Sequence, residues 1–294
     1  MKKIGFIGVG IMGKSMVRNL MKAGFELHIY ARTKSKVEDV IGEGAQFHES
    51  IKDCVQDCDA VITIVGFPQD VEEVYFDQGN ILDSAKEGAY LIDMTTTSPQ
   101  IAEKIYAEGT KRGFHVLDAP VTGGDTGAKA GTLSILVGGD KEDYEACMPL
   151  FEAMGTNINY QGKAGCGQHC KLANQIMIAG TLSGVCEALT YAKEQGLDPE
   201  VFMKSVATGA AGSKQLDTFG PKILKEDYAP GFFMKHFIKD MKLALIEANR
   251  KGLSLDVLSM VLANYEELEQ EGYGDLGTQA LMKFYDEEHR NMEE

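Results

Sequence analysis

The stretch KIGFIGVGIMGKSM, residues 3–16, decides the fold of the N-terminal half of this 294-residue chain. It places a strand-length apolar run directly before Gly8-x-Gly10-x-x-Gly13 and a helix-forming segment directly after it. In such a turn the first glycine permits the sharp bend, the second lets a pyrophosphate approach the backbone, and the third allows close helix–strand packing. The stretch therefore predicts a dinucleotide-binding turn, and a tight turn without a ligand is the alternative. The candidate cofactor contacts are Gly8, Gly10, Ile11, Met12 and Gly13.

Strand-length apolar runs recur through the first ~160 residues and alternate with amphipathic segments, as βαβ units do. The runs are nearly continuous in hydrophobicity, which is typical of strands covered on both faces. They lie at 3–8, 26–30, 60–65, 90–93, 115–119 and 134–139. We expect an α/β fold in which residues 1–163 form a Rossmann-type, mostly parallel, doubly wound sheet that binds NAD(P).

From residue 164 onward the apolar residues follow a helical period. Gly196 and Gly252 indicate helix ends, and Asp198-Pro199 indicates a new start. Helices are predicted over 166–194, 199–208, 235–251, 255–271 and 278–290, and no strand is predicted. We expect residues 164–294 to form an all-α domain, with 166–194 as a long interdomain helix.

Charge and composition exclude several classes of partner. The chain has 29 Lys+Arg against 44 Asp+Glu, a net charge of −15, whereas nucleic acids and anionic membranes require a basic face. No stretch approaches about 18 uninterrupted apolar residues, and the N-terminus lacks a small-residue cleavage site. We therefore expect a cytoplasmic protein that binds neither nucleic acid nor membrane.

The six cysteines are scattered and form neither a disulfide framework nor a zinc pattern. Cys166, His169 and Cys170 lie close together in the sequence, but no second ligand pair completes a tetrahedral set. We expect reduced thiols and no metal site.

The choice of cofactor is read at the end of the second strand, where an NAD site usually carries an acid. Here the sequence is HIYARTKSK, residues 28–36, with Arg32, Thr33 and Lys36 and no acid. An arginine can hold a 2′-phosphate with two hydrogen bonds. This favours NADP(H), with NAD(H) as the alternative; a solvated basic loop would tolerate either cofactor.

A second glycine-rich segment follows the strand that ends near Ala119. Thr122, Gly123 and Gly124 free backbone N–H groups and add a hydroxyl, which together suit a carboxylate. The segment predicts a substrate-carboxylate cradle, and a purely structural turn is equally open from these residues alone.

The segment CGQHCKLANQ, residues 166–175, places Lys171, Asn174 and Gln175 on one helical face, and the spacing also puts Gly167 there, as room for a ligand. A fixed lysine can supply the proton that a carbonyl oxygen needs as hydride arrives, and Asn174 can orient both groups. The alternative is that Lys171 extends its apolar stem along a domain interface.

These motifs together resemble the β-hydroxyacid dehydrogenase family, which includes 3-hydroxyisobutyrate dehydrogenases, tartronate semialdehyde reductases and glyoxylate- or succinic-semialdehyde-reducing enzymes. GFIGVGIMG is similar to its cofactor turn, DAPVTGG to its substrate segment and the glycine–lysine–asparagine spacing of 165–175 to its catalytic helix. FIKDMKLAL, with Lys239 and Asp240, resembles its Lys-Asp pair. DMTTTSP resembles its nicotinamide segment and nominates Thr96, and Val65 is added as a cofactor contact.

The resemblance implies a cleft between the two domains as the active site, and homodimers or homotetramers built through the helical domain. It implies that Lys171 and Asn174 are catalytic, with Lys171 as acid in reduction and base in oxidation. Thr122, Gly123 and Gly124, together with Gln175, would bind substrate, Lys239 would support substrate or nicotinamide ribose, and Asp240 would belong to the cofactor site with it. Gly277 stands where a second acid is often found, which leaves the role of Asp275 open.

The resulting expectation is an NADPH-driven reductase of a small carboxylated aldehyde or ketone. Glyoxylate, succinic semialdehyde, tartronate semialdehyde and methylmalonate semialdehyde are the candidate substrates. An NAD-linked 3-hydroxyisobutyrate-type dehydrogenase is the enzymatic alternative. A catalytically silent dinucleotide-binding scaffold is the alternative from another class, disfavoured because Lys171 and Asn174 are both present.

Overall fold

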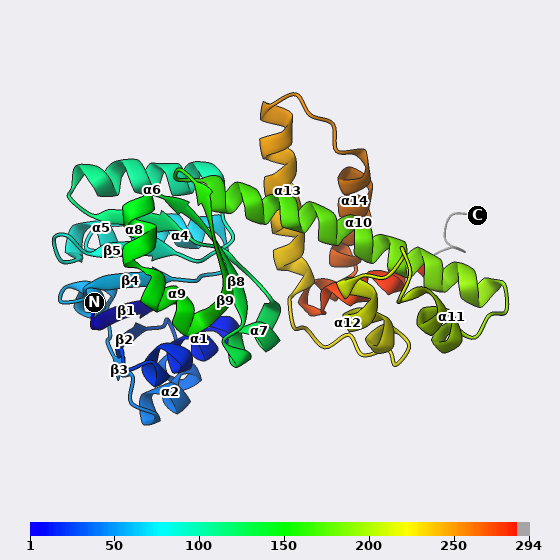
Figure 1. The fold of residues 1–294 in the computed structure, drawn as a ribbon, viewed down its shortest axis with the longest axis horizontal. Coiled ribbons are helices and arrows are strands. Elements are labelled where there is room, and N and C mark those ends of the chain that lie inside the picture. The colour runs from blue at the N-terminus through cyan, green and yellow to red at the C-terminus, as the bar shows by residue number, and fades with distance from the viewer. Residues whose placement is uncertain (287–294) are drawn as a thin grey trace. The chain divides into compact units, whose positions relative to one another are not determined.

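The structure is a computed structural model that describes residues 1–286 (Figure 1). The chain divides into two compact units, Met1–Lys171 and a second that begins at Leu172. Helix α10 (Cys166–Glu194) begins in the first unit and continues through the second. The predicted fold class, a mostly parallel Rossmann-type sheet followed by helices, is confirmed. The opening turns of α10 pack with the sheet unit.

The first unit is built on one sheet with the strand order β3-β2-β1-β4-β5-β6-β8-β7, and β9 pairs with β8. The strands are β1 (Lys3–Ile7), β2 (Glu26–Tyr30), β3 (Gln46–Phe47), β4 (Ala60–Thr63), β5 (Tyr90–Asp93), β6 (His115–Asp118), β7 (Val121–Thr122), β8 (Leu133–Gly139) and β9 (Gly155–Gly162). From β3 to β6 all pairs are parallel, whereas β8 is antiparallel to β6 and β7 and parallel to β9. The strand order reverses between β1 and β4, and open sheets of this type bind ligands at that point.

Two hydrophobic cores cover the two faces of this sheet because side chains alternate along each strand. On β1, Ile4 and Phe6 enter one core while Ile7 enters the other. The first core is completed by α1 (Ile11–Lys22), α2 (Glu38–Gly42), α7 (Gly124–Ala130) and α9 (Met148–Met154). The second is completed by α3 (Ile51–Val55), α4 (Pro68–Phe76), α5 (Ile81–Ser84) and α6 (Pro99–Lys111). The remaining helices of the unit before α10 are η1 (Lys34–Lys36) and α8 (Lys141–Ala146).

The regular elements of the second unit are all helices in its described part. Besides α10 it contains α11 (Pro199–Val206), α12 (Lys214–Ile223), α13 (Met234–Arg250), α14 (Asp256–Gln270), η2 (Tyr273–Asp275) and η3 (Thr278–Tyr285). Its core includes the fully buried side chains of Leu182, Phe237 and Tyr265.

The helices predicted at 166–194, 199–208, 235–251 and 255–271 are present, with ends that differ by two residues at most. Two details of this half were predicted wrongly. Helix α12 was not predicted, and the segment predicted as an α-helix from 278 is a 3₁₀ helix, η3, that ends at Tyr285. Residues 287–290 of that prediction lie outside the described residues.

Within residues 1–286, α10 is the single helix long and apolar enough, by length and composition alone, to cross a membrane. Core helices of soluble proteins pass the same test. Leu182 and Cys186 of α10 are fully buried in the core of the second unit, which accounts for the apolar composition of the helix.

Candidate active site

The glycine turn after β1 has the geometry that the sequence predicted. Gly8 has a φ of +97°, and a Cβ there would lie 2.1 Å from the carbonyl oxygen of Ile64. A Cβ on Gly13 would lie 2.2 Å from the carbonyl oxygen of Gly8, so the helix can approach the strand only with glycine at this position. The backbone geometry of the turn alone therefore requires glycine at positions 8 and 13, whether or not a ligand binds.

Gly10 differs from its two neighbours because it faces open space. It is the N-cap residue of α1, no side chain caps the helix there, and a Cβ would meet nothing within 4 Å. Ile11 is 51% exposed beside it, and Met12 is partly buried. An uncapped helix start with open space at its cap glycine fits the pyrophosphate of a dinucleotide, because helix N-termini attract anions.

The basic loop after β2 carries Arg32, Thr33 and Lys36 as exposed residues. Arg32 has an acidic neighbour that the sequence analysis missed: its Nη1 lies 3.3 Å from Oδ1 of Asp70 on α4. Asp70 also accepts the backbone N–H of Phe67 at 2.9 Å, which fixes it at the start of α4. The arginine predicted to bind the 2′-phosphate is thus paired with a partly buried carboxylate.

The ends of β4 and β5 are joined by a hydrogen-bonded layer. The backbone N–H of Val65 donates to Oγ1 of Thr95 at 3.0 Å, and Thr96, partly buried, follows Thr95 directly. Thr63 donates to Oδ1 of Asp93 at 2.8 Å, and the same oxygen accepts the N–H of Thr95 at 3.1 Å. The structure therefore links the segments that hold Val65 and Thr96.

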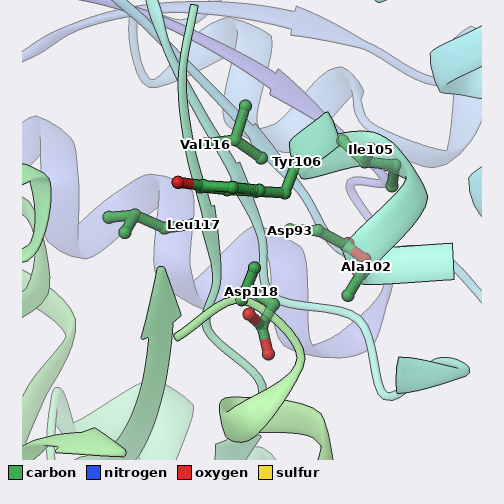
Figure 2. A pocket seen from close by; sticks show the side chains of 8 residues that line it. Asp93, Ala102, Ile105, Tyr106, Val116, Leu117 and Asp118 are labelled. Carbon is green, nitrogen blue, oxygen red and sulfur yellow. The ribbon is translucent and has the colours of Figure 1, made fainter. Parts of the chain in front are cut away.

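Asp93 and Asp118 are buried carboxylates at the ends of neighbouring strands, where they are register partners. Figure 2 shows both on the wall of a small cavity, beside Tyr106 of α6. Asp93 Oδ2 has no hydrogen-bond partner among the described residues, and burial raises the pKa of Asp93 to about 6. Burial also raises the pKa of Asp118, although backbone N–H donors oppose that shift.

The predicted carboxylate cradle lies where β7 passes into α7. Thr122 is partly buried and pairs with Ser134 of β8, and Gly123 and Gly124 are exposed. Both glycines have positive φ, +128° and +64°, a backbone region that other residues rarely adopt. The turn therefore favours glycine at both positions, and the binding of a substrate carboxylate by this segment stays a prediction.

The start of α10 is closed by the sheet. Asp118 accepts the N–H of Gly165 at 2.8 Å through Oδ1 and the N–H of Gln168 at 2.9 Å through Oδ2. A Cβ on Gly167 would lie 2.4 Å from the carbonyl oxygen of Leu136 and 2.7 Å from that of Asp118. The prediction that Gly167 leaves room for a ligand is therefore wrong, because the strands β6 and β8 fill that room.

Lys171 follows one turn later and is the last residue of the first unit. Its exposure is 7%, which is unusual because lysine is almost never fully buried unless it is paired. The glycine turn, the Thr122–Gly124 segment, Thr96 and Lys171 therefore belong to one compact unit.

The remaining predicted residues lie in the second unit and form their own hydrogen-bond chain. Asn174 donates to Oε1 of Gln175 at 2.8 Å, and Gln175 donates to Oδ2 of Asp240 at 2.7 Å. Lys239 Nζ lies 3.0 Å from Oδ1 of Asp240, which is 1% exposed. The structure thus brings Asn174, Gln175, Lys239 and Asp240 together.

Asp275 accepts a hydrogen bond from Lys235 at 2.6 Å and is mostly exposed. In residues 1–286, no group of three or more His, Cys, Asp or Glu side chains is arranged to hold a metal ion, and all six cysteines are free thiols.

Comparison with known proteins identifies both halves of the chain. Residues 3–162 match the family model described as the NAD binding domain of 6-phosphogluconate dehydrogenase. Residues 165–285 match the model described as NAD-binding of NADP-dependent 3-hydroxyisobutyrate dehydrogenase.

Whole-length relatives support the same assignment. The chain is 50% identical to an uncharacterized oxidoreductase of Bacillus subtilis, over 97% of this chain and 99% of the relative. It is 45% identical to a probable 3-hydroxyisobutyrate dehydrogenase-like protein of Arabidopsis thaliana, over 95% and 84%. The solved structure of Mycobacterium tuberculosis 3-hydroxyisobutyrate dehydrogenase with L-serine aligns with a TM-score of 0.88 at 28% identity, covering 96% and 98%.

Other relatives are named for different substrates. They include an NAD-dependent L-serine dehydrogenase of Pseudomonas aeruginosa at 36% identity and a 2-hydroxy-3-oxopropionate reductase of Escherichia coli at 37%. A glyoxylate/succinic semialdehyde reductase of Arabidopsis thaliana is 32% identical. Overall similarity therefore leaves the substrate open.

Proposed function

Because this chain belongs to the β-hydroxyacid dehydrogenase family, we propose that it uses NADPH to reduce a small carboxylated aldehyde or ketone to the hydroxy acid. Family membership makes the chain an NAD(P)-dependent oxidoreductase; the proposal concerns the substrate class, the direction and the preferred cofactor. The observation that carries it is the burial of Lys171, 7% exposed, in the same unit as the open glycine turn.

The proposed reaction assigns one proton to Lys171. When bound, the reduced nicotinamide supplies a hydride to the carbonyl carbon. Lys171 Nζ gives a proton to the carbonyl oxygen, so that one C–H and one O–H bond form as the π bond of the carbonyl breaks. In the oxidative direction Lys171 accepts the same proton. Positioned acid–base groups of this kind typically contribute about 10²–10⁴-fold to the rate.

The cofactor is assigned to the glycine turn and its neighbours. Gly8, Gly10 and Gly13 would hold the pyrophosphate, with Ile11 and Met12 beside it, and Val65 and Thr96 would contact the nicotinamide side.

We propose that Arg32, Thr33 and Lys36 hold the 2′-phosphate of NADP(H). The Arg32–Asp70 ion pair would be exchanged for an arginine–phosphate pair. The Arg32 side chain is 73% exposed, so solvent screening weakens its attraction to Asp70. NAD(H) remains the alternative cofactor, since Asp70 already supplies an acid near this loop.

Substrate groups are assigned by their chemistry. Thr122, Gly123 and Gly124 would bind the carboxylate through backbone N–H groups and a hydroxyl. Asn174 and Gln175 would orient the carbonyl end. Lys239, held by Asp240, would support the substrate or the ribose.

The candidate substrates are glyoxylate and succinic, tartronate and methylmalonate semialdehydes. An NAD-linked 3-hydroxyisobutyrate-type dehydrogenase is the alternative. The names of two relatives add L-serine as a test substrate for the oxidative direction.

We further propose a homodimer or homotetramer formed through the helical unit, in the cytoplasm. Met177 and Tyr191 on α10 are 74% and 67% exposed, and Ile246, Val257 and Met260 on α13 and α14 are about half exposed or more. Contiguous exposed apolar patches are typical of surfaces that another protein covers, and α10 and α14 adjoin here, since a Cβ on Gly180 of α10 would lie 3.5 Å from Val257. Light scattering should give two or four times the mass of one 32.0 kDa chain, and a monomer would contradict this assignment.

The test of the function is a panel assay with purified protein. NADPH and NADH are each supplied with the four carbonyl compounds, and NADP⁺ and NAD⁺ with 3-hydroxyisobutyrate and L-serine. The proposal expects the highest kcat/KM for NADPH with a semialdehyde or glyoxylate. A higher kcat/KM with NAD⁺ and a hydroxy acid would favour the alternative.

A further inference from the structure

Gln168 makes contacts that the reaction proposed above does not use. Its side chain is fully buried, one turn before Lys171 on α10. The side-chain amide donates from Nε2 to the carbonyl oxygen of Thr95 at 2.7 Å and accepts through Oε1 the N–H of Thr97 at 3.0 Å. One side chain therefore binds the backbone immediately before and immediately after Thr96.

Gln168 is itself fixed at its backbone. Its N–H donates to Oδ2 of Asp118, whose other oxygen holds Gly165. Thr95, the partner of the side chain, also accepts the N–H of Val65. A continuous set of hydrogen bonds thus runs from the end of β4 through the Thr95–Thr97 segment to the start of α10, entirely within the first unit.

Helical geometry connects this contact to Lys171. Residues three apart lie on the same face of a helix, and helical side chains lean toward the N-terminus. Lys171 therefore leans over the turn that carries Gln168. Gln168 thus binds the backbone on both sides of Thr96, the residue proposed to contact nicotinamide, and lies three residues before Lys171, the residue proposed to deliver the proton.

We infer that Gln168 is a positioning residue, which sets Thr96 and Lys171 in the mutual placement that delivers hydride and proton to one carbonyl group. This inference rests on the proposed function. Misplacement of reacting groups by about 1 Å can cost about 10²-fold in rate, and a buried amide with both hydrogen bonds made permits little movement.

Three variants separate positioning from simple stabilisation. Gln168→Met keeps the volume and removes both hydrogen bonds. Gln168→Glu keeps the acceptor for Thr97 but, when ionised, loses the donor to Thr95; when protonated it regains both. Gln279→Met is the matched control, because Gln279 is also buried and donates to the carbonyl oxygens of Asp227 and Ala229 in the second unit.

The measurements are kcat, KM, cofactor Kd and Tm for each protein between about pH 5.5 and 8, the range in which a buried glutamate titrates. We expect kcat to fall about 10²-fold in Gln168→Met, with KM and cofactor Kd within about threefold of the wild type. In Gln168→Glu, kcat relative to the wild type should rise as the pH falls. Gln279→Met should lower Tm and leave kcat within about twofold.

A kcat within twofold of the wild type in Gln168→Met would overturn the inference, and so would an equal kcat loss in Gln279→Met at an equal loss of Tm. A wild type inactive on the whole panel would instead remove the proposed function. In that case the fluorescence of bound NADPH still decides the inference. Unchanged emission and anisotropy in Gln168→Met would overturn it, and a more mobile nicotinamide would support it.

Discussion

Two helices that begin in the first unit follow the same Gly-x-Gly pattern, but the surroundings of the two patterns are opposite. Helix α1 begins after GVG, at Gly8–Gly10, and its cap glycine faces open space without a capping side chain. Helix α10 begins at GCG, Gly165–Gly167, and its N–H groups are taken by Asp118 while strands fill the space beside Gly167. An open helix start suits a ligand, and a closed one suits an anchor.

Glycine spacing in a sequence therefore indicates that another group lies close to the backbone. It does not indicate whether that group is a ligand or another part of the protein. At α1 the space beside Gly10 remains open to a ligand. At α10 the approaching group is the sheet itself, and the helix is held so that Lys171 and Gln168 keep their places.

The largest effect is expected on kcat, from substitution of Lys171 near the N-terminal end of α10. Lys171→Met should lower kcat by about 10³-fold, since the carbonyl oxygen loses its proton donor, while cofactor Kd stays near the wild-type value. Single-turnover kinetics and a binding titration with NADPH measure the two quantities. A variant with nearly normal kcat would remove Lys171 from the proposed mechanism.

The comparison is tested directly by placing alanine in each helix start. Gly167→Ala should lower the free energy of unfolding by about 3 kcal/mol, because its Cβ would press on two carbonyl oxygens. Gly10→Ala should change that free energy by less than about 1 kcal/mol, since its backbone is extended and its surroundings are open. It should instead weaken cofactor binding about tenfold, as expected for the glycine at the pyrophosphate.

Chemical denaturation and cofactor titration of both variants measure these effects. If the two alanine variants lower the free energy of unfolding equally, the start of α10 is no more tightly packed than the start of α1.

The free energy of unfolding is expected to depend on pH through Asp93, at the end of β5. Asp93 has a folded-state pKa of about 6, and its unfolded pKa is about 3.9, so folding favours its protonated form. Its contribution to stability is present below about pH 4 and is lost as the pH rises through about 6. The upper bound for this loss is about 3 kcal/mol.

Asp93→Asn should remove that part of the pH profile. Unfolding free energies of both proteins at intervals from pH 4 to 7 measure it. Parallel profiles would show that Asp93 is not protonated in the folded protein in this range.

The smallest effect is expected on cofactor affinity, at the basic loop after β2. Arg32→Ala should weaken NADPH about tenfold and NADH hardly at all, because only NADPH has the 2′-phosphate. Asp70→Asn should change the preference in the opposite direction, since it frees Arg32 from its carboxylate partner while an amide oxygen can still accept the N–H of Phe67. Dissociation constants for both cofactors provide the measurement, and an equal loss of both in Arg32→Ala would contradict the phosphate assignment.

Periodic features were predictable from the sequence, and features made by tertiary contact were not. The six apolar strands and helix α10 were found because their patterns are local. Strand β9 was missed because its residues are mostly partly or fully exposed and its stretch, GTNINYQG, has no apolar run. Helix α12 was missed because Gly220 and Pro221 lie inside it.

The site follows the same division. The glycine turn and the face of Lys171, Asn174 and Gln175 were predicted from spacing. The roles of Asp118 and Gln168 depend on backbone groups that are distant in the sequence, and no spacing rule reports them. The capping role of Asp70 has a local signal in the sequence, because an acid stands three residues after Phe67, the N-cap of α4. The contact of Asp70 with Arg32 has no such signal.

The continuous course of α10 has a practical consequence for recombination between related chains. A chimaera joined before the helix, near residue 163, would pair Asp118 and the Thr95–Thr97 segment with a foreign Gln168 position. A junction after Lys171 keeps the donor and acceptor groups of the first unit in one parent, although it falls inside a helix. Exchange of the helical half among relatives with different substrates should therefore succeed more often with the seam at 171 than at 163.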